Sequence, residues 1–108
     1  MVTISKELLK IINNYVLELS KEININKVIL FGSYAKGTNH EDSDIDLAIF
    51  SDDFSNMDRI EALKFLLLKA SDLTVDLQPQ PFTLADLEDE DNWLAKEVEE
   101  TGIELNVA

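Results

Sequence analysis

Residues 27–50 read KVILFGSYAKGTNHEDSDIDLAIF, and the alternation of apolar runs and polar breaks in this stretch decides the fold. After one lysine, residues 28–31 are all β-branched, aliphatic or aromatic, which predicts a buried strand over 27–31. Gly32-Ser33 ends that run abruptly, and Ser33 to Lys36 predicts a helical turn or short helix closed by Gly37. The polar residues 38–43 predict a loop, and residues 44–50 predict a second strand.

The second predicted strand places two carboxylates on one face. Because successive side chains of a strand point to opposite faces, Ile45, Leu47 and Ile49 share one face, while Asp44 and Asp46 share the other. The two acids lie roughly 6.5–7 Å apart along the chain. They repel each other unless water or a cation neutralises them. Two interpretations stay open: a solvated face of an amphipathic strand, or a pair of ligands for a divalent cation.

The Gly32-Ser33 turn follows directly after a strand. Glycine lets backbone N–H groups approach a phosphate closely, and a helix that begins there directs free N–H groups at the anion. Ser33 adds a hydroxyl donor. A strand followed by Gly-Ser and a turn is common, so this feature alone does not establish a phosphate site.

Helical spacing of apolar residues predicts three longer helices in the remainder of the chain. One runs from Ser5, its N-cap, to about Lys21. The second runs from Asn56 to about Ala70 with Ser55 as its cap, after a loop that contains Asp52 and Asp53. The third runs from Asp91 or Asn92 through Glu100 and stops at Gly102. For the second helix, the residues predicted to share the buried face are Met57, Ile60, Leu63 and Leu67.

A third strand is expected from Thr74 to Gln78, ended by Pro79 and Pro81. Thr83 is expected to cap a short turn through Leu87, and residues 103–105 to form a terminal strand. The predicted fold class is therefore α/β, a small mixed sheet flanked by helices. At 108 residues the chain is expected to be a single domain, 1–108, which leaves no room for a separate acceptor-binding domain.

Asp76 stands between Val75 and Leu77 in the third predicted strand, a position where an acid is unfavourable. One interpretation is an edge-strand acid that faces water. If this strand lies beside residues 44–50, however, Asp76 joins Asp44 and Asp46. Three acids beside a phosphate-binding turn would form a site for a divalent cation and a triphosphate.

The composition limits the kinds of site that the chain can build. There is no cysteine and one histidine, so any metal must be held by oxygen, which favours Mg²⁺, Mn²⁺ or Ca²⁺. His40 is expected to be exposed in its loop, with a nucleotide contact as the lesser option. No apolar run approaches the roughly 20 residues that span a bilayer, and residues 1–6 lack the order of a signal peptide. We therefore expect a cytoplasmic protein with no membrane contact.

The formal net charge is −13, which disfavours direct binding of DNA or RNA. The acids are unevenly placed, because residues 84–104 contain nine acids and one base, Lys96. The charge either keeps the protein soluble or attracts a basic partner.

Gly32 to Gly37, followed by Ser43 to Leu47, resembles the Gly-Ser and Asp-x-Asp signature of the DNA polymerase β-like nucleotidyltransferase superfamily. The short chain is similar to the minimal nucleotidyltransferase branch, whose members commonly act as antitoxins of HEPN-domain toxins. The resemblance implies the polymerase β-like fold, ATP as substrate, two Mg²⁺ ions with Mn²⁺ as a substitute, and a HEPN toxin as partner. It implies transfer of AMP to a tyrosine of that toxin, with homo- or hetero-oligomers as further options.

The resemblance also assigns roles to residues. Gly32 and Ser33 would hold the β- and γ-phosphates of the nucleotide, and Asp44 and Asp46 would ligate Mg²⁺. Asp76 matches the third acid, which ligates the metal nearest the acceptor and takes its proton. Lys36 stands where the branch often has arginine, so it would meet a phosphate as a point charge without the bidentate fork.

Two alternatives to a protein-modifying enzyme remain from the sequence. The chain could be a non-catalytic antitoxin that blocks its toxin by contact alone. It could also modify a small molecule of the aminoglycoside type, with an acceptor site supplied by a partner, since acidic surfaces attract such cations.

Overall fold

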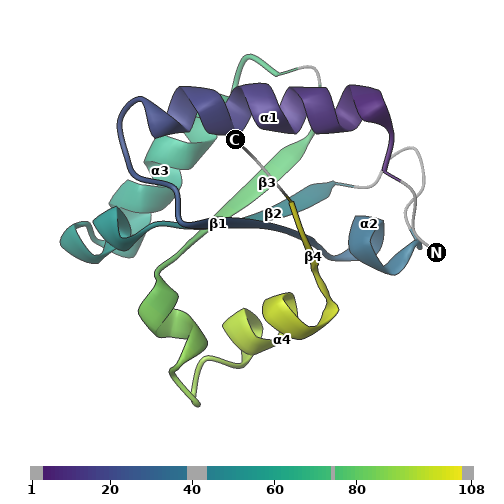
Figure 1. Ribbon diagram of the computed structural model, residues 1–108. Coiled ribbons are helices and arrows are strands. Elements are labelled where there is room, and N and C mark those ends of the chain that lie inside the picture. The colour runs from purple at the N-terminus through teal and green to yellow at the C-terminus, as the bar shows by residue number, and fades with distance from the viewer. Residues whose placement is uncertain (1–3, 39–43, 74, 106–108) are drawn as a thin grey trace.

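The computed structural model describes residues 4–38, 44–73 and 75–105, and its elements are arranged as in Figure 1. The helices are α1 (Lys6–Ser20), α2 (Ser33–Lys36), α3 (Arg59–Ala70) and α4 (Trp93–Thr101), joined by the 3₁₀ helices η1 (Asp52–Asn56) and η2 (Leu84–Leu87). The strands are β1 (Lys27–Phe31), β2 (Ile45–Phe50), β3 (Leu77–Phe82) and β4 (Ile103–Glu104). None of the helices in these ranges is long and apolar enough to cross a membrane.

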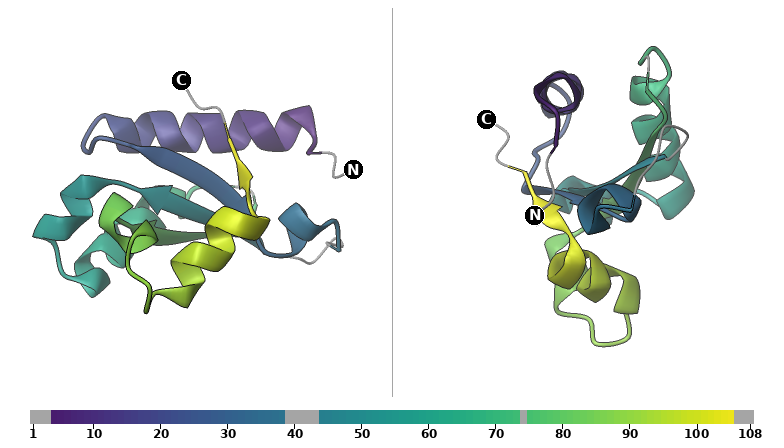
Figure 2. Two further views of the ribbon diagram at one scale, coloured as in Figure 1. Left: turned by 60° about the horizontal axis from the view of Figure 1, so that its bottom comes forward. Right: turned by 90° about the vertical axis from the view of Figure 1, so that its right-hand side faces the viewer.

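The four strands form one sheet in the order β3-β2-β1-β4. β1 is antiparallel to both β2 and β4, whereas β2 and β3 are parallel. The predicted small mixed sheet flanked by helices is therefore confirmed. α1 and α3 cover one face of the sheet and α4 covers the other (Figures 1 and 2).

Each face of the sheet has its own apolar core. Strand alternation directs Ile45, Leu47 and Ile49 towards α1 and α3, where they pack with residues such as Ile12 and Leu66. On the opposite face, buried side chains of three strands pack against two small side chains of α4; this second cluster is Ile29, Ala48, Phe50, Phe82, Ala95 and Val98. β2 is therefore buried on both faces except where Asp46 stands.

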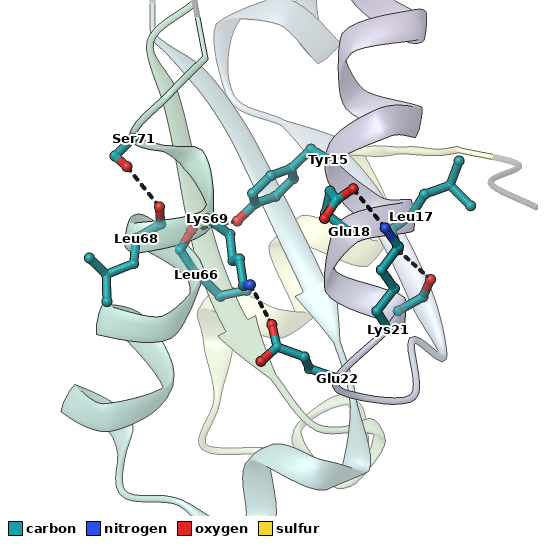
Figure 3. Close-up of polar contacts among 10 residues, drawn as sticks. Tyr15, Leu17, Glu18, Lys21, Glu22, Leu66, Leu68, Lys69 and Ser71 are labelled. Atoms are coloured by element: carbon teal, nitrogen blue, oxygen red, sulfur yellow. Dashed lines mark hydrogen bonds and ion pairs between the residues drawn. The ribbon is translucent and has the colours of Figure 1, made fainter.

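α1 begins as predicted, because the Leu8 N–H donates to the Ser5 hydroxyl at 3.1 Å. Two polar contacts join α1 and the turn that follows it to α3 (Figure 3). The buried Tyr15 hydroxyl donates to the Leu66 carbonyl at 2.8 Å, and burial raises the pKa of Tyr15. The Lys69 ammonium pairs with Glu22 at the far end of the same interface. These contacts fix the layer that supports the core face of β2.

The predicted position of the third strand is wrong. β3 begins at Leu77 and includes both prolines that were expected to end it. β3 is an edge strand that pairs only with β2, and the carbonyls of Asp76 and Phe82 accept hydrogen bonds from β2 and the residue after it. The odd-numbered residues of β3 therefore direct their backbone nitrogens away from β2, to the open edge of the sheet. Pro79 and Pro81 have no N–H group, so at these positions they lose no hydrogen bond.

The predicted start and buried face of the second long helix are also wrong. Asp58, not Ser55, caps α3, since its carboxylate accepts from the Glu61 N–H at 2.8 Å. The residues expected in a loop and at the cap form η1 instead. Ala62 and Leu66 are buried, while Ile60 is 69% exposed. Apolar residues surround this helix on nearly every side, so periodicity alone does not select its inner face.

Candidate active site

The end of β1, the beginnings of β2 and β3, and the short helix α2 lie together at one end of the sheet. This end, where the strands begin or finish, is called the site edge below. The antiparallel register pairs Phe31 at the end of β1 with Asp46, and the parallel register pairs Ile45 with Leu77. The end of β1 and the beginnings of β2 and β3 therefore lie side by side. The predicted neighbours, the Gly32-Ser33 turn and the Asp44/Asp46 pair, are brought together at this edge.

Gly32 lies directly against the carboxyl group of Asp46. A Cβ atom built on Gly32 would overlap an Asp46 carboxylate oxygen and approach its Cγ to 3.1 Å. The Gly32 backbone also has φ of +74° and ψ of −149°, a conformation that L side chains rarely adopt. The positive φ therefore favours glycine here, and a side chain at this position would also have to displace the Asp46 carboxyl group.

Asp44, directly before β2, affects the ionisation of Asp46 in β2. Asp46 is half-buried, and burial raises its pKa above the ordinary value, with the negative charge of Asp44 adding to the shift. Asp44 is exposed. The solvated-face interpretation does not describe this strand, because Ala48 and Phe50 on the same face as Asp46 are fully buried. On this face of β2, Asp46 is instead the last polar side chain before the apolar cluster that packs against α4.

Asp76 lies at the site edge, immediately before β3. Its carbonyl accepts the Ile45 N–H at 2.8 Å, so its backbone is fixed beside β2. The Leu77 N–H donates to the Val75 carbonyl at 3.1 Å, which closes a γ-turn around Asp76 and interrupts the extended backbone. Within the described ranges, no three histidine, aspartate or glutamate side chains are grouped to hold a metal ion. The three-acid cluster therefore stays a prediction, while the shared edge is a feature of the structure.

α2 follows Gly32 as predicted and ends at Gly37, whose φ of +74° and ψ of 17° are left-handed. Ser33 is half-buried in its first turn. Lys36 is exposed and forms a 3.9 Å ion pair with Glu97 of α4. Sequence reasoning missed Glu97, because no local pattern links α4 to α2. His40 and Ser43 lie outside the described residues.

The site thus combines a glycine-dependent turn, a short helix and a repelling acid pair at the site edge. The chain matches the family model described as "Polymerase beta, Nucleotidyltransferase" over residues 10–106, nearly its whole length. It belongs to the polymerase β-type nucleotidyltransferase family. None of the curated proteins matches this nucleotidyltransferase chain.

Three solved structures have a similar fold. A protein of Sulfolobus solfataricus assigned as a nucleotidyltransferase has a TM-score of 0.69 at 17% identity, covering 91% of this chain and 78% of that one. A toxin–antitoxin structure with AMP-PNP has a TM-score of 0.56 at 29% identity, covering 89% and 73%. A mutant of the toxin–antitoxin MntA–HpeT, with two aspartates changed to glutamates, has a TM-score of 0.54 at 25% identity, again covering 89% and 73%.

Proposed function

We propose that this nucleotidyltransferase transfers AMP from ATP to a tyrosine hydroxyl of a HEPN-domain toxin and thereby acts as the antitoxin of the pair. The observation that carries the proposal is the close contact between Gly32 and Asp46, which brings a backbone turn against an acid at the site edge. Family membership supports nucleotidyl transfer, and the likeness to two toxin–antitoxin structures, one with AMP-PNP, supports the partner and the nucleotide.

The chemistry of Asp44 and Asp46 fits a divalent cation. Carboxylate oxygens are preferred ligands of Mg²⁺, and two repelling carboxylates gain from a cation between them. A side chain at position 32 would displace the Asp46 carboxylate, and glycine leaves room for that carboxylate. We assign Asp44 and Asp46 as ligands of Mg²⁺, or Mn²⁺ in its place, and Asp76 as the third acid. Two ions held there would stabilise the charge on the attacking and leaving oxygens.

The residues of the turn position the nucleotide. Gly32 and Ser33 hold the β- and γ-phosphates, with backbone N–H groups and the Ser33 hydroxyl as donors. Lys36 adds a positive charge at the end of α2, although its pairing with Glu97 must loosen for it to reach a phosphate. The geometry of these groups, rather than a covalent intermediate, lowers the barrier.

In the reaction, the tyrosine oxygen attacks the α-phosphorus of ATP in line with the leaving group. One bond forms between the tyrosine oxygen and the α-phosphorus, and the bond from the α-phosphorus to the bridging oxygen of pyrophosphate breaks. The tyrosine proton passes to Asp76 and then to water. The products are the AMP-modified tyrosine and pyrophosphate.

The surface charge suits this acceptor. A toxin that cleaves RNA needs basic residues to bind phosphates, and a chain of net charge −13 attracts such a protein. The same charge repels nucleic acid as a direct substrate.

The proposal is tested by incubating the chain with α-³²P-labelled ATP, Mg²⁺ and the protein encoded beside it. We expect label on that protein, and no label with Asp44→Asn/Asp46→Asn. Asp52→Asn/Asp58→Asn, exposed acids elsewhere, serve as the matched control and retain transfer. An unlabelled partner, or label with the Asp44→Asn/Asp46→Asn variant, would contradict the assignment. A variant that transfers nothing yet still neutralises the toxin would favour the binding-module interpretation.

A further inference from the structure

Trp93 at the start of α4 is the exception among the aromatic residues. Its surface is 70% exposed, whereas the other aromatic side chains that the structure describes are buried or half-buried. An indole at this position serves neither the core nor the helix, because Ala95 and Val98 already pack on the sheet and tryptophan is an ordinary helix former. A large exposed aromatic side chain is typical of a contact point for a partner.

Acidic side chains surround this residue in the chain and on the helix. Helical spacing places Glu97 one turn and Glu100 two turns beyond Trp93 on the same outer face, together with the one base of this segment, Lys96. Directly before the helix the chain reads Glu-Asp-Glu-Asp from residue 88, and all four are exposed. In the described part of the chain, the acids that form no ion pair within 4.0 Å include Glu88, Asp89, Glu90, Asp91 and Glu100.

The helix that carries Trp93 is firmly held. Its inner residues Ala95 and Val98 are buried against the sheet, and the Ala95 N–H donates to the Asn92 cap at 3.1 Å. Glu97 forms an ion pair with Lys36 of α2, the short helix at the candidate site. α4 lies on the same side of the sheet as Asp46. A partner on the outer face of α4 can therefore bind without any rearrangement of the helix.

We infer that the outer face of α4, centred on Trp93 and bordered by the acids of residues 88–91 and by Glu100, is the docking surface for the basic partner protein. An arginine or lysine of that partner stacks on the indole as a cation over an aromatic ring, and the surrounding acids steer the approach. The inference rests on the proposed partner and adds the surface that binds it.

A second exposed apolar surface, on α3, suits a basic partner less well. On α3, Ile60 and Leu68 are 69% and 73% exposed, and Leu68 points away from the core (Figure 3). That helix carries Arg59, Lys64 and Lys69 against one acid, Glu61. Like charges there repel a basic surface, whereas residues 84–104 carry nine acids and one base.

The test measures binding of the protein encoded beside this chain by calorimetry, with no nucleotide present. We expect Trp93→Ala to weaken binding by at least about tenfold, as for an interface hot spot. Leu68→Ala, a matched exposed apolar residue on α3, changes it less than about twofold. In stopped-flow mixing at low salt, Glu90→Gln/Glu100→Gln slows association, and Glu18→Gln/Glu61→Gln, exposed acids elsewhere, does so less.

Each outcome bears on a different statement. Equal binding by the parent and Trp93→Ala overturns the docking surface alone, as does an equal loss in Trp93→Ala and Leu68→Ala. No binding by the parent chain overturns the proposed partner and the surface together. Loss of binding only with Trp93→Ala supports the surface even where the separate transfer assay finds no AMP on the partner. Thermal melting of each variant shows that the fold is intact, because both single substitutions remove exposed side chains.

Discussion

Gly32 and Gly37 have the same φ of +74°, but their surroundings differ. Gly32 faces the Asp46 carboxyl group, while Gly37 closes α2. We expect Gly32→Ala to push Asp46 out of place and to reduce transfer by about a hundredfold, as misplacement of a catalytic group does. Gly37→Ala should cost about 1 kcal/mol of stability for the left-handed backbone and keep most of the activity.

The two backbones differ, since Gly32 has ψ of −149° and Gly37 has ψ of 17°, so Gly37→Ala controls only for the loss of a neighbouring glycine with positive φ. Initial transfer rates and urea unfolding of both variants provide the measurement. If Gly32→Ala retains transfer while Gly37→Ala loses it, the Asp46 contact is not the reason for glycine at position 32.

The raised pKa of Asp46 predicts how stability depends on pH. Its protonated form is favoured by folding, so the folded chain binds more protons than the unfolded chain near and above the ordinary pKa of 3.8. The contribution of this group is present at lower pH and is lost as the pH rises through the raised pKa. In EDTA, Asp46→Asn should therefore gain stability relative to the parent as the pH rises from about 3 to about 6.

Divalent cations should reverse this preference. Mg²⁺ or Mn²⁺ with ATP should raise the melting temperature of the parent and leave Asp46→Asn unchanged, because only the parent keeps both ligands. Urea unfolding across pH in EDTA measures the first response, and thermal melting with and without Mg²⁺-ATP measures the second. If Mg²⁺-ATP left the melting temperature of the parent unchanged and raised that of Asp46→Asn, the assignment would be contradicted.

At the scale of elements, Gly102 joins α4 to β4 at a point with no room for a side chain. A Cβ there would overlap the Ile29 side chain and the Val98 carbonyl, and would lie 3.0 Å from the Leu30 carbonyl. The last helix ends at Gly102 as predicted, but the Gly102 backbone has a φ of −80°, which is not left-handed. Packing, not backbone conformation, demands the glycine.

We therefore expect Gly102→Ala to lower the unfolding free energy by about 1–3 kcal/mol, the usual cost of overpacking against backbone. Thr101→Ala, the exposed neighbouring residue, should change it by less than about 0.5 kcal/mol. Denaturant unfolding of the two variants measures the difference. Equal stabilities would mean that α4 can shift away from β1 at little cost.

The elements that the sequence predicts well are those with local signals at both ends. β1 has the predicted bounds because apolar residues fill it and Gly32 follows it, and the Ser5 cap locates α1. The third strand was predicted with the wrong bounds, because tolerance of Pro79 and Pro81 depends on a place at the edge of the sheet, which only the fold decides.

The same limit applies to the candidate site. The spacing of Asp44 and Asp46 fixes their shared face, and their place beside Gly32 follows from the hairpin register. The γ-turn at Asp76 and the Lys36–Glu97 pair arise from tertiary contacts. Local periodicity has no information about either, so the sequence predicted the acids and not the orientation of the third.

At the scale of the whole molecule, the net charge of −13 should give salt two opposite effects. Self-repulsion opposes the compact state, and salt screens it, since the Debye length falls to about 10 Å at 0.1 M. The melting temperature of the free chain should therefore rise between low and high NaCl.

The complex with a basic partner should weaken over the same range, mainly through slower association. Scanning fluorimetry and stopped-flow mixing measure the two responses, and KCl in place of NaCl should give the same result because ionic strength is the cause. A partner whose association is insensitive to salt does not use the acidic face of α4, whatever its affinity.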